Sequence, residues 1–279
     1  MTLLSTNITT AEFEEILTCY PALIRDISDS KARTTKGDSL EDLDEFRFKI
    51  APAKYNRKKD GKDDDAHILP LEKVDVLKLV TWKLKHGTFR PKLMQLAASN
   101  SEKDITRTTS EAYQTYRGDH SNAFKAVKLL TSLKGIGPAT ASLLLSVHAP
   151  ADVVFFGDEV YQWICCGGQK KSIKYNLKEY QDLLTRSRTL AERLRVDASD
   201  VEKVGFVIMR GSSTLTQQHI HSFDPAKENM ASDLKMHEMG EGITPSPPLP
   251  KKSKRSASRT RPAESASTTS KRLRRDKKS

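Results

Sequence analysis

The chain has 279 residues, of which 37% are hydrophobic, and its three cysteines form neither a disulfide framework nor a metal-binding spacing. No secretory signal is evident and no apolar run approaches the ~18 residues of a membrane span, so the sequence favours an intracellular protein without membrane segments. Residues 241–279 hold +9 of the net charge of +11, which leaves +2 for the other 240 residues, so bulk charge gives no evidence that the body binds nucleic acid.

The first quarter of the chain predicts helices separated by polar loops. Apolar residues at helical spacing predict a helix over 10–27, bent or broken near Pro21. Residues 28–44 are polar and predict a loop. The stretch 54–66 alternates blocks of opposite charge around a glycine, which is typical of a solvated surface loop.

A helix is predicted over 71–86, with an apolar stripe that includes Val74, Leu77 and Leu84 and with Gly87 at its end. The overlapping stretch "WKLKHGTFRP", 82–91, interleaves aromatic and basic residues. Either it contacts DNA, or Trp82 and Phe89 belong to the core while the charges form a solvated face.

The remaining pattern is also helical. We expect helices near 91–97, 104–115, 121–133, 138–148, 158–164 and 177–195, a short extended stretch at 152–156, and a last helix to about 209. Ser199 and Glu202 have the spacing of a capping box for that last helix. His148 is expected at a helix C-terminus, where a cation suits the dipole. The sequence predicts an all-α body over 1–212.

The segment 213–279 is predicted to be disordered, because a basic, Pro/Ser-rich chain with few aromatic residues buries too little apolar surface to offset its ordering entropy. Two basic clusters in it resemble a nuclear localisation signal; they are Lys251, Lys252, Lys254 and Arg255, and Lys271, Arg272, Arg274 and Arg275. These clusters would also hold DNA loosely, and the alternative is a merely solubilising tail. His219 and His221 lack metal partners.

The stretch "LKGIGP", 133–138, lies between two helical patterns. Gly135 suits the positive φ that ends a helix, Ile136 plugs the turn into the core, and Pro138 opens the next helix. The free N–H groups near 135–140, with the positive end of a helix dipole behind them, then face a natural phosphate site.

This pattern, over residues 121–148, resembles the helix–hairpin–helix motif of DNA-binding proteins. The resemblance implies that Gly135, Ile136, Gly137, Ala139 and Thr140 contact the backbone of double-stranded DNA. Such contacts position the duplex without reading its sequence. Short turns of this kind also join ordinary helices, so a purely structural role is the alternative.

A second feature extends the resemblance to about residue 164. In the helix–hairpin–helix DNA glycosylases, the superfamily of endonuclease III, an essential aspartate follows the hairpin at a helix start. Here Asp158 stands 21 residues after Gly137. A carboxylate beside the sugar stabilises the positive charge that develops when an N-glycosidic bond breaks, or deprotonates water. The alternative is that Asp158 simply N-caps its helix.

The departures from that family also have implications. Ala139 stands where bifunctional members carry a nucleophilic lysine, so the resemblance implies a monofunctional enzyme. No four-cysteine pattern follows Asp158, so no iron–sulfur cluster and no other cofactor is expected, although the resemblance allows a monovalent cation at the hairpin. Stretch 82–91 is also similar to fungal proteins that carry the same hairpin. We expect a nuclear, monomeric protein.

Three functions follow from these patterns. The first is a DNA-glycosylase-like repair protein in which Asp158 assists base removal. The second is a non-catalytic DNA-binding module that kept the hairpin and lost the pocket, and the third is a helical scaffold whose hairpin only packs.

Overall fold

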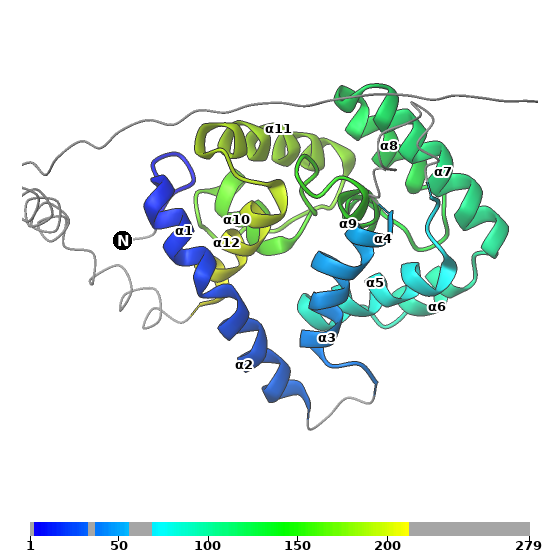
Figure 1. Ribbon diagram of the computed structural model, residues 1–279, viewed down its shortest axis with the longest axis horizontal. Helices are drawn as coiled ribbons and strands as arrows, with labels where there is room; N and C mark the ends of the chain where they lie inside the picture. Colours follow the sequence, from blue (N-terminus) through cyan, green and yellow to red (C-terminus); the bar gives the residue numbers. More distant parts are fainter. Residues whose placement is uncertain (1–2, 33–36, 56–68, 212–279) are drawn as a thin grey trace, which may run out of the picture. The chain divides into compact units, whose positions relative to one another are not determined.

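The computed structural model describes residues 3–32, 37–55 and 69–211. All regular secondary structure in these ranges is helical, which confirms the predicted all-α class (Figure 1). The expected disordered tail from residue 213, with its localisation clusters and both tail histidines, lies outside the described residues, as does most of the charged stretch 54–66.

The helices agree closely with the predicted ones from residue 71 onward. They are α1 (Thr10–Thr18), α2 (Tyr20–Ala32), α3 (Leu40–Glu45), α4 (Ala51–Tyr55), α5 (Lys73–His86), α6 (Leu93–Ala98), α7 (Glu102–Gly118), α8 (Ala123–Leu130), α9 (Pro138–His148), α10 (Asp158–Cys166), α11 (Leu177–Leu194) and α12 (Ala198–Arg210), with a π-helical turn η1 (Phe46–Ile50) and a 3₁₀ turn η2 (His120–Asn122).

The N-terminal prediction is right in one part and wrong in another. The expected break near Pro21 falls at Cys19, between α1 and α2. The expected loop over 28–44 is wrong, because α2 continues to Ala32 and α3 begins at Leu40. The Ser39 hydroxyl accepts from the backbone N–H of Asp42, whose carboxylate accepts from the N–H of Ser39, so a capping box starts α3 within that polar stretch.

The buried face of α5 differs from the predicted stripe. Val74 is 64% exposed, whereas Val76, Leu79 and Trp82 are buried. Two apolar stripes run along this helix, and tertiary packing selects the one that includes Trp82.

Helix α9 is the central element of the fold. Every residue from Ala139 to His148 is buried, and α4, α5, α7, α8 and α11 all pack against it. A helix that is apolar or small on all sides must be surrounded by other elements, so the helix that leaves the hairpin is enclosed by the core. The hairpin is therefore attached to the most constrained helix of the chain.

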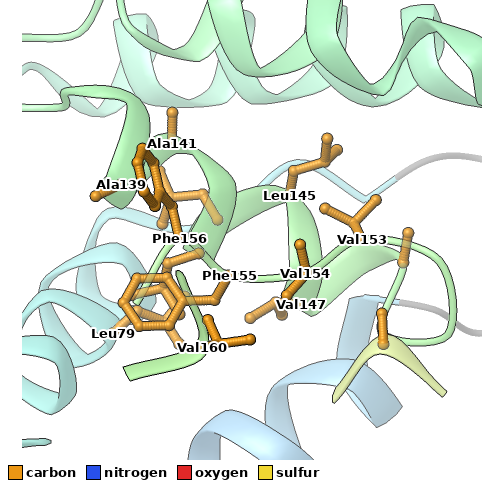
Figure 2. Packing of buried hydrophobic residues seen from close by; sticks show 14 of the residues in the cluster. Leu79, Ala139, Ala141, Leu145, Val147, Val153, Val154, Phe155, Phe156 and Val160 are labelled. Atoms are coloured by element: carbon orange, nitrogen blue, oxygen red, sulfur yellow. The ribbon is translucent and has the colours of Figure 1, made fainter. Parts of the chain in front are cut away.

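The expected extended stretch 152–156 falls almost entirely in the linker 153–157, which leads into α10 and has no regular secondary structure. Val153, Val154, Phe155 and Phe156 are all buried, and Figure 2 shows them in one cluster with residues of α9. Helix α10 then packs on α12, where a Cβ at Gly205 would lie 3.0 Å from the Cα of Val160. A side chain at this position would crowd the backbone of α10, so Gly205 favours the close packing of α12 on α10.

His148 ends α9 as predicted, but it is not the dipole-stabilised cation that the sequence suggests. Its ring stacks on Tyr113 with centroids 4.1 Å apart, and its Nδ1 has no hydrogen-bond partner in the described part of the chain. Burial, aided by the charge of Arg117, lowers the pKa of His148 to about 4. The folded protein therefore holds this ring neutral.

We predict that His148 lowers stability in acid. The unfolded chain, with a histidine pKa near 6.5, binds the proton more readily than the folded chain. The neutral ring therefore makes its full contribution to the free energy of unfolding above about pH 6.5. As the pH falls toward 4, the free energy of unfolding decreases by up to about 3 kcal/mol. His148→Phe keeps the stacking and should flatten this part of the stability profile, measured by urea unfolding between pH 4 and 7.

The matched control is His120→Phe, because His120 also stacks on a tyrosine, Tyr116, but its side chain is 66% exposed. This variant should keep the acid slope of the unaltered protein. The prediction would be contradicted if the free energy of unfolding fell equally steeply with decreasing pH in the unaltered protein, in His148→Phe and in His120→Phe.

Candidate functional site

A cleft of about 630 Å³ brings the hairpin and Asp158 together. It is lined by three parts of the chain that are distant in sequence: the end of α5 with the following loop and α6, the hairpin with the start of α9, and the start of α10 with Tyr175. The residues that the sequence analysis singled out and that line this cleft are Gly135, Gly137, Ala139, Thr140 and Asp158. Ile136 lies in the same turn but its side chain is buried, as predicted.

The turn has the geometry that its sequence predicts. Gly135 has φ +77°, and a Cβ there would lie 2.6 Å from the Cβ of Leu96. Gly135 is thus required both by its backbone conformation and by the contact with α6. Pro138 is the first residue of α9, and Gly137 precedes it in an extended conformation with nothing within 4 Å of a Cβ built there.

Of the five residues predicted to contact the DNA backbone, three have a backbone N–H group without an acceptor among the described residues. The N–H of Ile136 donates to the carbonyl of Leu133 at 3.1 Å, and that of Thr140 to the carbonyl of Gly137 at 3.0 Å. Within the described residues, the N–H groups of Gly135, Gly137 and Ala139 have no acceptor. The expectation of free N–H groups near 135–140 is therefore wrong for Ile136 and Thr140, while contact of these residues with DNA stays a prediction.

Asn100, which the sequence analysis missed, holds the hairpin in place. Its Nδ2 donates to the carbonyl of Lys134 at 2.9 Å, and its Oδ1 accepts from the Lys134 N–H at 2.8 Å. Nδ2 also reaches the carbonyl of Ala97 at the end of α6. This buried amide therefore ties the turn to α6, and no local pattern in the sequence marks it.

Asp158 is the first residue of α10, but it does not cap the helix. The N-cap is Gly157, and no side chain caps this end. Instead the Tyr175 hydroxyl donates to Oδ1 of Asp158 at 2.7 Å and the Thr88 hydroxyl to Oδ2 at 3.4 Å. The interpretation of Asp158 as a structural cap is therefore wrong, and its carboxylate is held by two hydroxyls at the cleft.

Tyr175 is unusual in its backbone. It has φ +54°, a left-handed conformation that a bulky side chain rarely adopts. Burial, followed by the hydrogen bond to Asp158, raises the pKa of Tyr175 to about 12, so its hydroxyl remains a donor at neutral pH. Backbone strain of this kind persists where the surrounding structure enforces it, and it clusters at functional sites.

Two buried side chains position the linker that leads to Asp158. The Glu202 carboxylate accepts from the N–H of Phe155, and the Ser142 hydroxyl accepts from the N–H of Phe156 at 2.8 Å. Glu202 also pairs with the fully buried Arg47 at 2.8 Å. The predicted capping box of Ser199 and Glu202 is therefore wrong: Asp197 is the N-cap of α12, without a side-chain cap bond.

The cleft carries charges of both signs. Glu159, next to Asp158, is nearly buried and pairs with Arg210 at 2.6 Å. Lys83, Arg90 and Lys92 line the cleft together with Asp158. Burial lowers the pKa of Lys83, the Asp158 carboxylate acts against this, and Arg90 adds to it.

Stretch 82–91 follows neither of its two interpretations completely. Trp82 is in the core, but Phe89 is 67% exposed, so its predicted core position is wrong. Lys83, His86 and Arg90 line the cleft and do not simply form a solvated surface. Residues of stretch 82–91 therefore form one wall of the candidate site.

In the ranges that the structure describes, no three His, Cys, Asp or Glu side chains gather as metal ligands do, and no helix has the length and apolar character of a membrane span. Comparison with family models, with curated proteins and with solved structures gives no match for this chain. The geometry of the cleft therefore carries the functional argument.

We predict that Asn100→Ala destabilises the fold by about 1–3 kcal/mol, because the part-buried N–H and carbonyl of Lys134 and the carbonyl of Ala97 all lose their partner, the buried Asn100 amide. The matched control is Ser99→Ala. Ser99 is the exposed neighbour and its hydroxyl bonds only within its own turn, so its loss should cost less than about 0.5 kcal/mol. Urea unfolding of the two variants gives the comparison, and equal losses would show that Asn100 does not hold the turn.

Proposed function

We propose that this protein is a DNA-glycosylase-like repair protein, in which the hairpin holds the DNA backbone and Asp158 assists removal of a base. The observation that carries the proposal is one cleft that is lined both by Asp158 and by the three hairpin residues whose N–H groups have no acceptor among the described residues. A module that only bound the DNA backbone would need the amides alone.

The hairpin supplies the binding step of the proposal. Three N–H groups without an acceptor, at the N-terminus of the enclosed helix α9, suit a phosphate oxygen because the helix dipole adds about half a positive charge there. Gly137 leaves open space beside these groups, so a sugar–phosphate backbone can approach them.

Asp158 supplies the chemical step. A target base must leave the duplex stack before it can enter a cleft, at a cost of a few kcal/mol. Once the base is inside, a carboxylate beside the sugar carbon stabilises the cationic transition state or deprotonates the attacking water. Tyr175 and Thr88 donate to this carboxylate from two sides, which fixes its direction and leaves each oxygen able to accept a further bond.

The mainly apolar walls of the cleft suit a flipped base. Leu93 and the largely buried rings of Phe155 and Phe156 line it, and they give an apolar surface against which a base can pack. Base removal of this kind needs water as its nucleophile and no cofactor. We propose double-stranded DNA as the partner, and the basic clusters of the tail as the signal that brings a monomeric protein to the nucleus.

The first test concerns catalysis. Duplexes that carry uracil, an alkylated base or an oxidised base are incubated with the protein, and alkali then cleaves any abasic site. Asp158→Asn should lower the rate of product formation by about 10²–10⁴-fold, because general acid–base catalysis is worth that much. Asp182→Asn on the exposed face of α11 is the control and should leave the rate unchanged. Product from none of the duplexes, or equal product from both variants, would contradict the catalytic role.

The second test concerns binding. Gly137→Glu places a negative charge beside the free amides without a steric clash, because the space around Gly137 is empty. Binding of the full chain to duplex DNA should weaken at least about tenfold, since a charge-assisted hydrogen bond is worth about 1.5–3 kcal/mol and 1.4 kcal/mol is tenfold.

Thr185→Glu adds the same charge on an exposed turn of α11 that does not line the cleft, and it should change the affinity little. Equal affinity of the two variants, measured by fluorescence anisotropy at several salt concentrations, would leave the hairpin as a packing element. Binding that depends on Gly137 without any base removal would favour the non-catalytic module.

A further inference from the structure

The segment 167–178, which leads from α10 into α11, is strongly basic. It holds four lysines, Lys170, Lys171, Lys174 and Lys178, and no acidic residue, although the first 240 residues together carry a net charge of only +2. All four lysines are exposed, and in the described part of the chain no carboxylate lies within 4 Å of their ammonium groups. The charge of this segment is therefore not compensated within those residues.

Two lysines elsewhere in the fold show the alternative, which is an acidic partner. The Nζ of Lys54 lies 2.8 Å from a carboxylate oxygen of Asp75, and that of Lys203 lies 2.8 Å from one of Asp200. Lysines that lie close together without such partners repel one another. A group of them therefore forms a surface that gains from contact with a polyanion.

The backbone of the same segment has hydrogen-bond donors that the protein does not use. The N–H groups of Lys170, Lys171, Ser172 and Ile173 have no acceptor among the described residues. Phosphate oxygens accept hydrogen bonds both from lysine ammonium groups and from backbone N–H groups. Two independent kinds of phosphate donor therefore occur together over residues 170–174.

The fold holds this segment at several points. Gly167 ends α10 with φ +62°, and its N–H donates to the carbonyl of Gln162. The side-chain amide of Gln162 donates to the carbonyl of Lys171 at 3.4 Å, and the Glu179 carboxylate accepts from the N–H of Lys174 at 3.0 Å. A segment that is already held loses less conformational entropy when it binds a ligand.

The segment reaches the cleft through Tyr175, which directly follows Lys174. Tyr175 lines the cleft and donates its hydroxyl to Asp158 at 2.7 Å. Arg90, another residue of the cleft, lies 5.5 Å from the centroid of the Tyr175 ring. The basic segment thus borders a wall of the cleft that the hairpin does not form.

We propose that residues 170–174 form a second binding site for the sugar–phosphate backbone, separate from the hairpin. This inference rests on the proposed function for its partner, double-stranded DNA, but on no catalytic step. The hairpin alone holds the duplex at one point, about which the duplex can turn. A second contact on another wall fixes the direction of the strand past Asp158, and it reads no sequence because it is made to phosphate.

The first measurement follows the unused N–H groups in the unaltered full chain by hydrogen–deuterium exchange and mass spectrometry. Exposed N–H groups without an acceptor exchange quickly with solvent. A saturating amount of an undamaged DNA duplex should slow exchange over residues 170–173 at least about tenfold, because a charge-assisted hydrogen bond is worth that factor in an equilibrium constant. Unchanged exchange over these residues would overturn the proposal.

The second measurement is the salt dependence of affinity for the same duplex. A triple variant carries Lys170→Gln, Lys171→Gln and Lys174→Gln. In a plot of the logarithm of the binding constant against the logarithm of the salt concentration, its slope should be smaller in magnitude by about 2.7, because each lost phosphate contact contributes about 0.9.

The matched control removes the same charge from exposed positions that do not line the cleft, with Arg25→Gln, Lys49→Gln and Arg195→Gln in one chain. Its slope should differ from that of the unaltered protein by less than about 1, which is the value of a single contact. Equal slopes for the two triple variants would overturn the proposal, because net charge alone would then explain the loss.

The same experiments separate this inference from the proposed function. Slower exchange at the hairpin amides alone, together with base removal, would contradict only the second binding site. Slower exchange over 170–173 without base removal from any lesion would contradict only the glycosylase step. Absence of any binding to the duplex would overturn both.

Discussion

The position of the candidate catalytic group depends on one buried carboxylate, that of Glu202. The linker 153–157 has no neighbouring strand among the described residues, so its buried N–H groups need acceptors from side chains. Glu202 accepts from Phe155 and is itself held by Arg47, whose guanidinium lies 4.4 Å from the centroid of the Phe48 ring. Loss of one member of a buried pair costs about 3–5 kcal/mol because the other charge remains uncompensated. The chain thus places α10, and with it Asp158, through a long-range ionic contact.

The sequence predicted the features that follow from residue type and apolar periodicity. It did not predict those that depend on contacts between residues far apart in the chain. Gly135, Ile136 and Pro138 each have a conformational or packing role that follows from their own residue type, and the structure agrees with all three. The helices 138–148 and 177–195 likewise follow from apolar periodicity. Glu202 lies 47 residues from the amide it holds, and its local spacing to Ser199 suggested a cap instead. Asn100 and Tyr175 carry no local signal either, because their roles arise only when separate segments meet.

The strain at Tyr175 favours a catalytic interpretation over a binding module. A left-handed tyrosine costs of order 1–3 kcal/mol, and a packing role alone does not require its hydroxyl to reach a carboxylate. Here the strained residue donates its hydroxyl to Asp158, while Arg90 lies over its ring at 5.5 Å. The fold therefore uses conformational energy to orient one acid at the cleft. A scaffold whose hairpin only packs gains nothing from this arrangement.

The near-neutral body also limits how the proposed DNA partner could be bound. With only +2 on the first 240 residues, the body has little general attraction for a polyanion, so its contacts must be few and well directed. The three unpaired amides at the start of α9 meet that requirement, because they act through geometry and a helix dipole rather than through net charge. In the proposed function, the net charge of +9 on residues 241–279 would supply the long-range attraction that the body lacks, and this attraction would fall steeply with salt. Under the proposed function, the tail would thus capture the duplex and the hairpin would align it, so that one sugar reaches Asp158.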